Sequence, residues 1–316
     1  MELMKTANPE YSFSKAELEI LEEIAKGKHE FSSIETARSI SPSLLSYNLQ
    51  KLQKKGLAKT AKKTYKKQAF FTDFKHATIL KDLLSVYDYI DWDNILSGKA
   101  IKILFQSLSE YDRNLAHIPK NTLWRHLKNL KARGIITPTN AINPQFSLLI
   151  EFLCEYQKFF ISKLARSVSE NSIILWQEDM EFMIRVPNNT KPSLETFFKT
   201  AISVFPQYNL SLFSEFDYYF YSTNKKTIKL EDALLHTLLI EPTNVRYTTY
   251  ALMLLKKTEQ QIDKTYLLQE ANRFGLKNKI TSMFQFLDNH IQPKDHSLPT
   301  WNEFITKAKD YMVMAE

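Results

Sequence analysis

Glycine and cysteine are scarce in this chain of 316 residues, and their scarcity excludes several kinds of site. The five glycines lie far apart along the chain. A phosphate-binding loop needs several glycines within a few residues, because its backbone N–H groups must approach the anion closely. A P-loop, a Rossmann fingerprint and a Gly-x-Ser-x-Gly nucleophile elbow are therefore excluded. The single cysteine, Cys154, allows no internal disulfide and no cysteine-based zinc site, and it is typical of a protein in the reducing cytoplasm.

Long apolar runs are also missing. The chain has no stretch of about 18 uncharged apolar residues, and its first residues, Met1 to Lys5, lack the apolar core of a signal peptide. We therefore predict a cytoplasmic protein with no membrane span. A hydrophobic fraction of 44% and a charged fraction of 24% are typical of folded globular proteins, and the length allows two or three domains.

A sequence repeat in the first half predicts two similar helical segments. Residues 42–57 and 120–135 align at a constant offset, with leucines at i, i+4 and i+7, then a glycine, then an apolar residue. This spacing places the leucines on one buried stripe of a helix, and the glycine ends that helix. The matched pairs are Leu45 with Leu123, Leu49 with Leu127, Leu52 with Leu130, Gly56 with Gly134, and Leu57 with Ile135.

Shorter helices are expected upstream of both segments. In the first copy, Ser14 caps a helix, residues 33–38 form a second one, and Pro42 begins the third. In the second copy, the corresponding helices cover residues 101–108 and about 112–117. After Gly56 the sequence predicts a strand, a basic turn and a returning strand.

Three helices followed by such a hairpin resemble the winged helix-turn-helix domains of transcription regulators of the MarR and ArsR classes. The resemblance covers about residues 12–90, and it extends over 92–145 with a shorter second hairpin at 135–143. The fold class that it implies is α+β and mostly helical, with two tandem winged helix-turn-helix domains before a small α+β domain with a helical tail. The predicted domains are residues 1–90, 91–168 (which ends with a long connecting helix from Phe146) and 169–316.

Lysines gather at the end of the third helix and on the hairpin. Between Asn48 and Lys75 there are nine lysines and one acid, Asp73, whereas the whole chain has a net charge of +7. Positive charge concentrated in this way is typical of a surface that binds phosphates, so we predict double-stranded DNA as the partner. The alternative is a solvated lysine face with no partner.

The residues that the leucine stripe leaves exposed are the candidates for DNA contact. Gln and Arg side chains make bidentate contacts to bases, whereas lysines and Tyr47 are expected at the phosphates. Trp124 is unusually large for a recognition helix, so a dimer-forming helix is an equal alternative for the second copy. The predicted DNA-binding residues are Ser43, Leu44, Ser46, Tyr47, Gln50, Lys51 and Lys54 on the first helix, Lys62, Lys63, Lys66 and Lys67 on the hairpin, and Asn121, Thr122, Arg125 and Lys128 on the second helix.

The second half predicts a small α+β domain. Strands are expected at 173–176, 181–186, 210–213 and 218–221, a helix at 194–204, and helices from residue 230 onward. The segment Lys229 to Leu239 and the helical pattern after it resemble the carboxy-terminal part of abortive-infection-type antitoxin regulators. This resemblance implies a regulator whose second half binds a protein partner or has lost the chemistry of an enzyme, and we expect a homodimer.

Carboxylates and histidines in the sequence do not assemble a catalytic site, and we predict no catalytic residue, no metal and no cofactor. Asp91 and Asp93 are interpreted as helix caps, and Glu178, Asp179 and Glu181 as solvated carboxylates in a hairpin. Asp232 and His236 stand four residues apart on a helix and are expected to share a hydrogen bond. Cys154 is expected to be an inert core thiol.

The sequence therefore predicts a DNA-binding transcription regulator rather than an enzyme. Two other hypotheses remain open. The first is an enzyme that acts on nucleic acid through a nucleotidyltransferase-like carboxy-terminal domain. The second is a replication or mobile-element scaffold in which the winged helices contact proteins.

Overall fold

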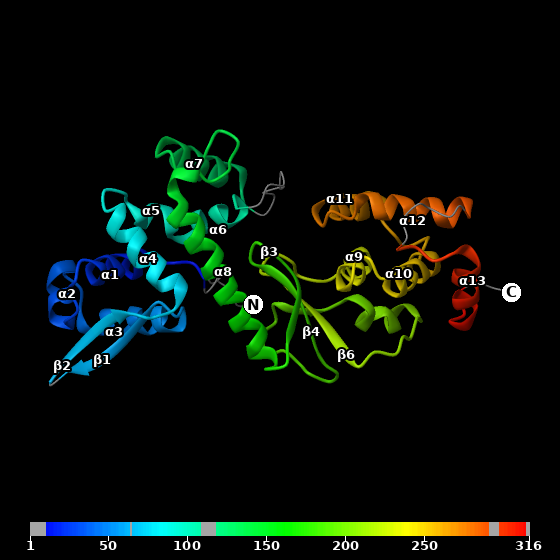
Figure 1. The fold of residues 1–316 in the computed structure, drawn as a ribbon, viewed down its shortest axis with the longest axis horizontal. Helices are drawn as coiled ribbons and strands as arrows, with labels where there is room; N and C mark the ends of the chain where they lie inside the picture. The colour runs from blue at the N-terminus through cyan, green and yellow to red at the C-terminus, as the bar shows by residue number, and fades with distance from the viewer. Residues whose placement is uncertain (1–10, 64, 109–117, 291–296, 314–316) are drawn as a thin grey trace, which may run out of the picture. The chain divides into compact units, whose positions relative to one another are not determined.

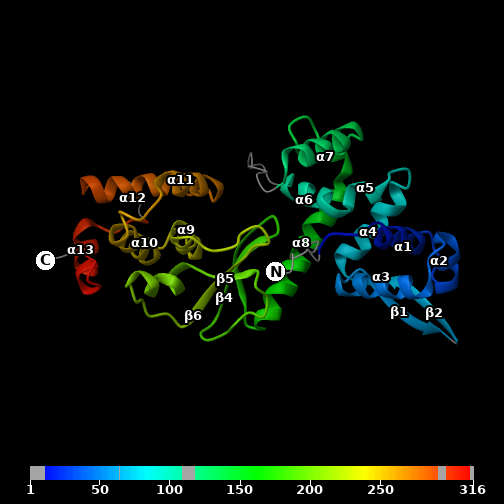
Figure 2. The same ribbon diagram turned by 180° about the vertical axis from the view of Figure 1, so that it is seen from behind.

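The computed structural model describes residues 11–63, 65–108, 118–290 and 297–313, and it is an α+β structure with two small sheets. Internal contacts divide the chain into two compact units, Met1–Ile161 and Ser162–Glu316 (Figures 1 and 2). Among the described residues, no helix is both long enough and apolar enough to cross a membrane.

The first unit begins with three helices, α1 (Lys15–Ala25), α2 (Phe31–Arg38) and α3 (Pro42–Lys54), where the sequence predicts them. Ser14 caps α1 through a capping box, in which its own N–H donates to the Glu17 carboxylate at 2.7 Å. Ser41 caps α3, and Pro42 occupies the first turn. The predicted leucine stripe of α3 is confirmed, since Leu45, Leu49 and Leu52 are buried.

A two-stranded antiparallel sheet of β1 (Ala58–Lys63) and β2 (Lys66–Phe71) follows α3. A single bridge from Glu30 to Gln68 and a 2.8 Å bond from the Ala69 N–H to the His29 carbonyl tie β2 to the segment between α1 and α2. The two strands of the hairpin extend past the helices (Figure 1). Its base is therefore held in a fixed position relative to α3.

Gly56 ends α3 in the left-handed conformation that the sequence predicts, with φ +68°. A Cβ added there would lie 2.5 Å from the Phe159 ring, so both the backbone and the packing require glycine. We expect Gly56→Ala to lower the free energy of unfolding by about 2–4 kcal/mol, because strained backbone and overpacking add.

Gly27→Ala is a matched control for this prediction. Gly27 also has a positive φ, +87°, but nothing lies within 4 Å of its added Cβ. Gly27→Ala should lower the free energy of unfolding by about 1 kcal/mol, because only backbone strain is added. Urea denaturation measures both variants, and equal losses would show that the ring of Phe159 does not press on Gly56.

The rest of the first unit is helical. Its long helix α8 confirms the predicted helix from Phe146 to Val168, and Tyr156 of α8 donates a 3.1 Å bond to the Tyr11 carbonyl. The predicted boundary between residues 90 and 91 lies inside this unit, where the Gly98 N–H donates to the Phe13 carbonyl at 3.1 Å. The elements are α4 (Lys75–Val86), α5 (Trp92–Leu96), α6 (Gly98–Gln106), α7 (Lys120–Ala132), η1 (Pro144–Phe146) and α8 (Ser147–Val168).

The second copy of the repeat is less complete than the first. Helix α7 is present, but of its leucine stripe only Leu130 is buried, and Leu123 and Leu127 are half-buried. The predicted hairpin at 135–143 is reduced to one bridge, between Ile136 and Ile142. The predicted helix at 112–117 lies outside the described residues.

The second unit contains a four-stranded antiparallel sheet in the order β3-β4-β6-β5. The sequence predicts β3, β4 and β6 correctly, and it predicts the hairpin turn, where Asp179 has a φ of 51°. The bounds are β3 (Ile173–Glu178), β4 (Glu181–Pro187), β5 (Phe197–Lys199) and β6 (Phe216–Tyr221).

Two predictions in this region are wrong. The predicted helix at 194–204 is instead strand β5 followed by the 3-10 helix η2 (Ala201–Tyr208), because Ala201 has a φ of 52° and interrupts any helix there. The predicted strand at 210–213 forms no ladder. Asn209 precedes it in the left-handed conformation, and Phe213 is exposed rather than packed in an alternating pattern.

Helix α9 (Leu230–Ile240) is the centre of the second unit. All eleven of its residues are buried, and it contacts β3, η2, α10 and α11. A helix buried all round must satisfy its polar side chains internally. The other helices, which the sequence places correctly, are α10 (Val245–Lys257), α11 (Lys264–Arg273), α12 (Lys277–Asn289) and α13 (Trp301–Asp310).

Candidate nucleic-acid interface

Helix α3 presents a continuous exposed stripe opposite its leucines. Ser43, Tyr47, Gln50 and Lys54 recur at i, i+4, i+7 and i+11, and all four are exposed. Leu44 beside them is also exposed, whereas Ser46 and Lys51 are half-buried. The Lys51 amino group lies 4.5 Å from the centre of the Tyr47 ring. The stripe therefore mixes hydrogen-bonding groups with positive charge, as a base-reading helix requires.

The hairpin has two faces, and its predicted lysines divide between them. Lys62 is opposite Lys67 in the register, and Lys63 is opposite Lys66, so each pair lies on one face. Thr60, on the same face as Lys62, accepts a 3.0 Å bond from the Gln53 side chain of α3. Lys62 and Lys67 are thus on the face that is directed toward α3, and the other pair is on the opposite face.

Among the described residues, at least four of the nine lysines are held by acids of the same unit, so the free positive charge is smaller than the composition indicates. Lys55 is buried, with its amino group 2.6 Å from Glu17. The other pairs are exposed, namely Lys59 with Asp73 at 2.6 Å, Lys66 with Glu30 at 2.8 Å, and Lys75 with Glu151 at 3.3 Å. Within the described part of the chain, Lys62, Lys63 and Lys67 have no ion pair.

The turn of the hairpin carries an aromatic residue that sequence reasoning missed. Tyr65 is 90% exposed and lies in the chain between Lys63 of β1 and Lys66 of β2. The sequence contains a signal for it, because an aromatic residue in a predicted turn between lysines is expected to be exposed. The lysine pattern drew the sequence interpretation to charge alone.

In the second copy, α7 presents Asn121, Arg125 and Lys128 to solvent, and Thr122 is half-buried. Trp124 is 64% exposed on the same helix, and the Lys128 amino group lies 5.0 Å from its ring centre. This surface carries an indole at its centre and has no two-stranded hairpin beside it among the described residues. The two copies therefore offer different surfaces.

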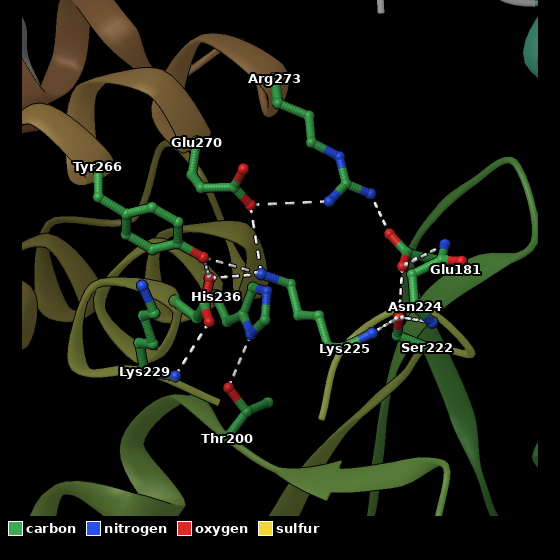
Figure 3. A network of polar contacts seen from close by, with 11 residues as sticks. Glu181, Thr200, Ser222, Asn224, Lys225, Lys229, His236, Tyr266, Glu270 and Arg273 are labelled. Carbon is green, nitrogen blue, oxygen red and sulfur yellow. Dashed lines mark hydrogen bonds and ion pairs between the residues drawn. The ribbon is translucent and has the colours of Figure 1, made fainter. Parts of the chain in front are cut away.

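A buried polar network in the second unit joins β4, the segment after β6, α9 and α11 (Figure 3). The Lys225 amino group donates to Asp232 at 2.7 Å and lies 3.3 Å from Glu270 and 3.2 Å from the Tyr266 hydroxyl. Burial opposes the charge on Lys225, but Asp232 and Glu270 outweigh it and raise the pKa of Lys225 above its usual value. The other Asp232 oxygen accepts the Lys229 N–H at 3.0 Å.

Glu181 belongs to this network, which corrects its interpretation as a solvated carboxylate. It is buried at the start of β4 and is bonded by Arg273 of α11, by the Ser222 hydroxyl and by the Asn224 amide. Burial opposes its ionisation, but Arg273 and Ser222 outweigh it and hold the pKa of Glu181 below its usual range. The three carboxylates of the network, Asp232, Glu270 and Glu181, are thus each bound by a cation, which leaves them poorly suited to hold a metal.

His236 does not form the predicted hydrogen bond with Asp232. Its Nδ1 lies 2.7 Å from the Thr200 hydroxyl, and its ring stacks on Phe220 at 4.2 Å. Complete burial lowers the pKa of His236 to about 3, so the ring is neutral at physiological pH. Asp232 instead uses Lys225 and Tyr266, because the lysine offers a full charge.

The remaining candidates have structural explanations. Asp91 precedes α5 but its carboxylate accepts from the Asn94 side chain instead of capping the helix, and burial raises the pKa of Asp93 to about 6. Cys154 is half-buried, and burial raises the pKa of its thiol. Within the described ranges, no group of three histidine, cysteine or acidic residues is arranged to hold a metal ion.

Comparison with known proteins bears on the second unit. A family model described as HVO_2833_C, C-terminal, matches residues 194–313, which is less than half of the chain. No curated protein and no solved structure matches. The family match does not reach α3 or the hairpin, so their role is interpreted from geometry and charge.

Proposed function

We propose that residues 12–90 form a winged helix-turn-helix that binds double-stranded DNA, and that the protein regulates transcription by occupying its site. The observation that carries this proposal is that one lysine-bearing face of the hairpin lies beside the exposed residues of α3. Lys62 and Lys67 lie on the hairpin face that is bonded to α3 through Thr60 and Gln53, and Gln53 is an exposed neighbour of Gln50 and Lys54 on α3. A polar helix flanked by cations complements a groove flanked by phosphates.

The proposed contacts follow from the chemistry of each side chain. Gln50 reads a base in the major groove, where its amide can bond adenine at two positions. Lys54, Lys62 and Lys67 contact phosphates and fix the register of α3, and Tyr47 and Ser43 donate hydroxyl bonds at the groove edge. The occupied site then excludes or recruits other proteins without any chemical step.

The incomplete second copy favours a homodimer of the proposed regulator. Among the described residues, only the first copy combines an exposed polar stripe with a two-stranded hairpin. One chain therefore offers one full DNA-contact surface. Two chains would contact two grooves of one duplex, which raises the effective affinity without new contacts.

The experiment that tests this proposal compares two double variants of equal charge. We expect Lys62→Ala/Lys67→Ala to weaken DNA binding at least about tenfold and to reduce the slope of log affinity against log salt by about 2 for each bound protomer, because each protomer loses two phosphate contacts. Lys63→Ala/Lys66→Ala removes the same charge from the opposite hairpin face, and its affinity should change much less. Fluorescence anisotropy with duplex DNA at several salt concentrations measures both.

Two results would contradict the proposal. Equal losses in both double variants would mean that charge alone, and not the placement of α3 beside Lys62 and Lys67, governs binding. Unchanged binding in Gln50→Ala, measured across duplexes selected from random sequence, would remove α3 as the reading helix.

A further inference from the structure

The second unit has a groove that the proposed DNA contact does not use and that shares one residue, Lys229, with the buried network. It is bordered by β5, by η2 and by the segment between β6 and α9, and its volume is about 340 Å³. Ligand pockets in proteins begin at about 300 Å³, so the groove can take a small organic molecule. All of its lining residues belong to the described part of the second unit.

The inner surface of the groove is apolar and partly aromatic. Phe197 and Val204 are nearly buried, and Phe198, Tyr208 and Ile228 are half-buried around them. Aromatic rings with accessible faces bind flat apolar groups by stacking and by removing their surface from water. This part of the groove therefore favours a ligand with an apolar or aromatic body.

The rim of the groove is cationic. Lys199, Lys226 and Lys229 line it together with Gln207 and Thr227, and no acid is among its lining residues. Lys199 is paired with Asp217 at 2.7 Å, and the Lys229 amino group lies 3.9 Å from the Tyr266 ring centre. Lys226 is exposed and, across the described residues, has no ion pair. Its charge is thus available to an anion in the groove.

The buried network holds this rim in place. The Ser222 hydroxyl accepts the N–H groups of Asn224 and Lys225 at 3.0 Å each, and the Lys225 side chain is anchored inside the network. The Lys229 N–H is held by Asp232. Residues 226–228, between these anchors, are therefore pre-positioned at the groove, and pre-positioning lowers the entropy cost of binding.

We propose that this groove binds a small organic anion with an aromatic or apolar body, with Lys226 as its principal charge contact. A neutral ligand would leave the charge of Lys226 unpaired, and a cation would be repelled by Lys226 and Lys229. The proposal does not depend on DNA binding, because every residue that it uses lies in the second unit.

The test uses a pair of fluorescent probes that share one aromatic body and differ in charge. 8-Anilinonaphthalene-1-sulfonate carries a sulfonate, and N-phenyl-1-naphthylamine does not. We expect the full-length protein to bind the sulfonate at one saturable site and to bind the neutral probe at least about tenfold more weakly, since a charged contact contributes a factor of this size. Lys226→Ala should remove most of this preference.

Two further variants complete the experiment. Gln207→Trp places an indole at an exposed groove position and should block both probes, whereas Lys309→Ala on α13 removes the same charge as Lys226→Ala elsewhere and should change neither affinity. Equal binding of the two probes, an effect of Lys309→Ala equal to that of Lys226→Ala, or unchanged binding in Gln207→Trp would each overturn the proposal.

Discussion

Lys225→Met is expected to destabilise the second unit by about 3–5 kcal/mol at pH 7, because it removes one partner of a buried ion pair. The Lys225 side chain is 12% exposed and that of Asp232 is 1% exposed, so water cannot replace the lost amino group. The Asp232 carboxylate would keep the Tyr266 hydroxyl and the Lys229 N–H, but no cation of comparable proximity. Methionine keeps the length of the lysine stem, so packing is largely preserved.

The pH dependence separates the lost charge from a packing defect. In the native protein burial opposes the ionisation of Asp232, but Lys225 outweighs it and the pKa of Asp232 is lowered. Its contribution is therefore present above the unfolded value of 3.8 and is lost as the pH falls through the folded pKa. In Lys225→Met, burial dominates and raises that pKa, so the deficit relative to the native protein should shrink as the pH falls from 7 to 4.

Hydrogen exchange of the α9 amides measures this effect, since a fully buried helix exchanges through unfolding of its unit. The control is Lys225→Met/Asp232→Asn, which removes both charges and should recover part of the loss. A deficit that is independent of pH, or a double variant less stable than the single one by the full additive amount, would contradict the argument.

Local signals in the sequence were enough to place most elements. The leucines at 45, 49 and 52 and Gly56 predict α3 and its end, and Ser14 predicts the start of α1, because capping and helical spacing depend only on residues within a few positions. The same spacing predicts most of the exposed α3 side chains, although Ser46 and Lys51 are half-buried. The predicted helix at 194–204 is wrong because Ala201 adopts a left-handed backbone conformation. Tertiary packing, rather than local propensity, imposes that conformation.

The pairing of charges could not be predicted in this way. Glu181 meets Arg273 across 92 positions, and Lys55 meets Glu17 across 38. Periodicity describes which face a residue occupies, but it contains no information on which distant face packs against it. The sequence-based prediction therefore includes Lys55, Lys59, Lys66 and Lys75 among the free charges, although an acid lies beside each of them in the folded protein. Among the described hairpin residues, the lysines without an acid partner are Lys62 and Lys67 on one face and Lys63 on the other.

His236 is expected to make the second unit lose about 2 kcal/mol of stability between pH 7.5 and pH 5. Burial lowers its folded pKa from 6.5 to about 3, with Asp232 opposing the shift. The unfolded chain binds a proton below about 6.5, but the folded protein does not. The contribution of neutral His236 to the free energy of unfolding is therefore present above pH 6.5. It declines by about 1.4 kcal/mol per pH unit as the pH falls toward 3.

His236→Gln tests this expectation, because glutamine can bond Thr200 and does not titrate. The variant should be less stable at pH 7.5, where the stacking on Phe220 is lost, but its stability should stay nearly constant down to pH 5. Hydrogen exchange of the α9 amides, corrected for the intrinsic pH dependence of exchange, gives both profiles. The two curves should approach each other as the pH falls, since above pH 5 the carboxylates of Asp232 and Glu181, whose pKa values are lowered, remain ionised. Parallel curves would show that His236 is protonated in the folded state, and a charged imidazolium stacked inside the core would then require a partner for Nε2, which has none among the described residues.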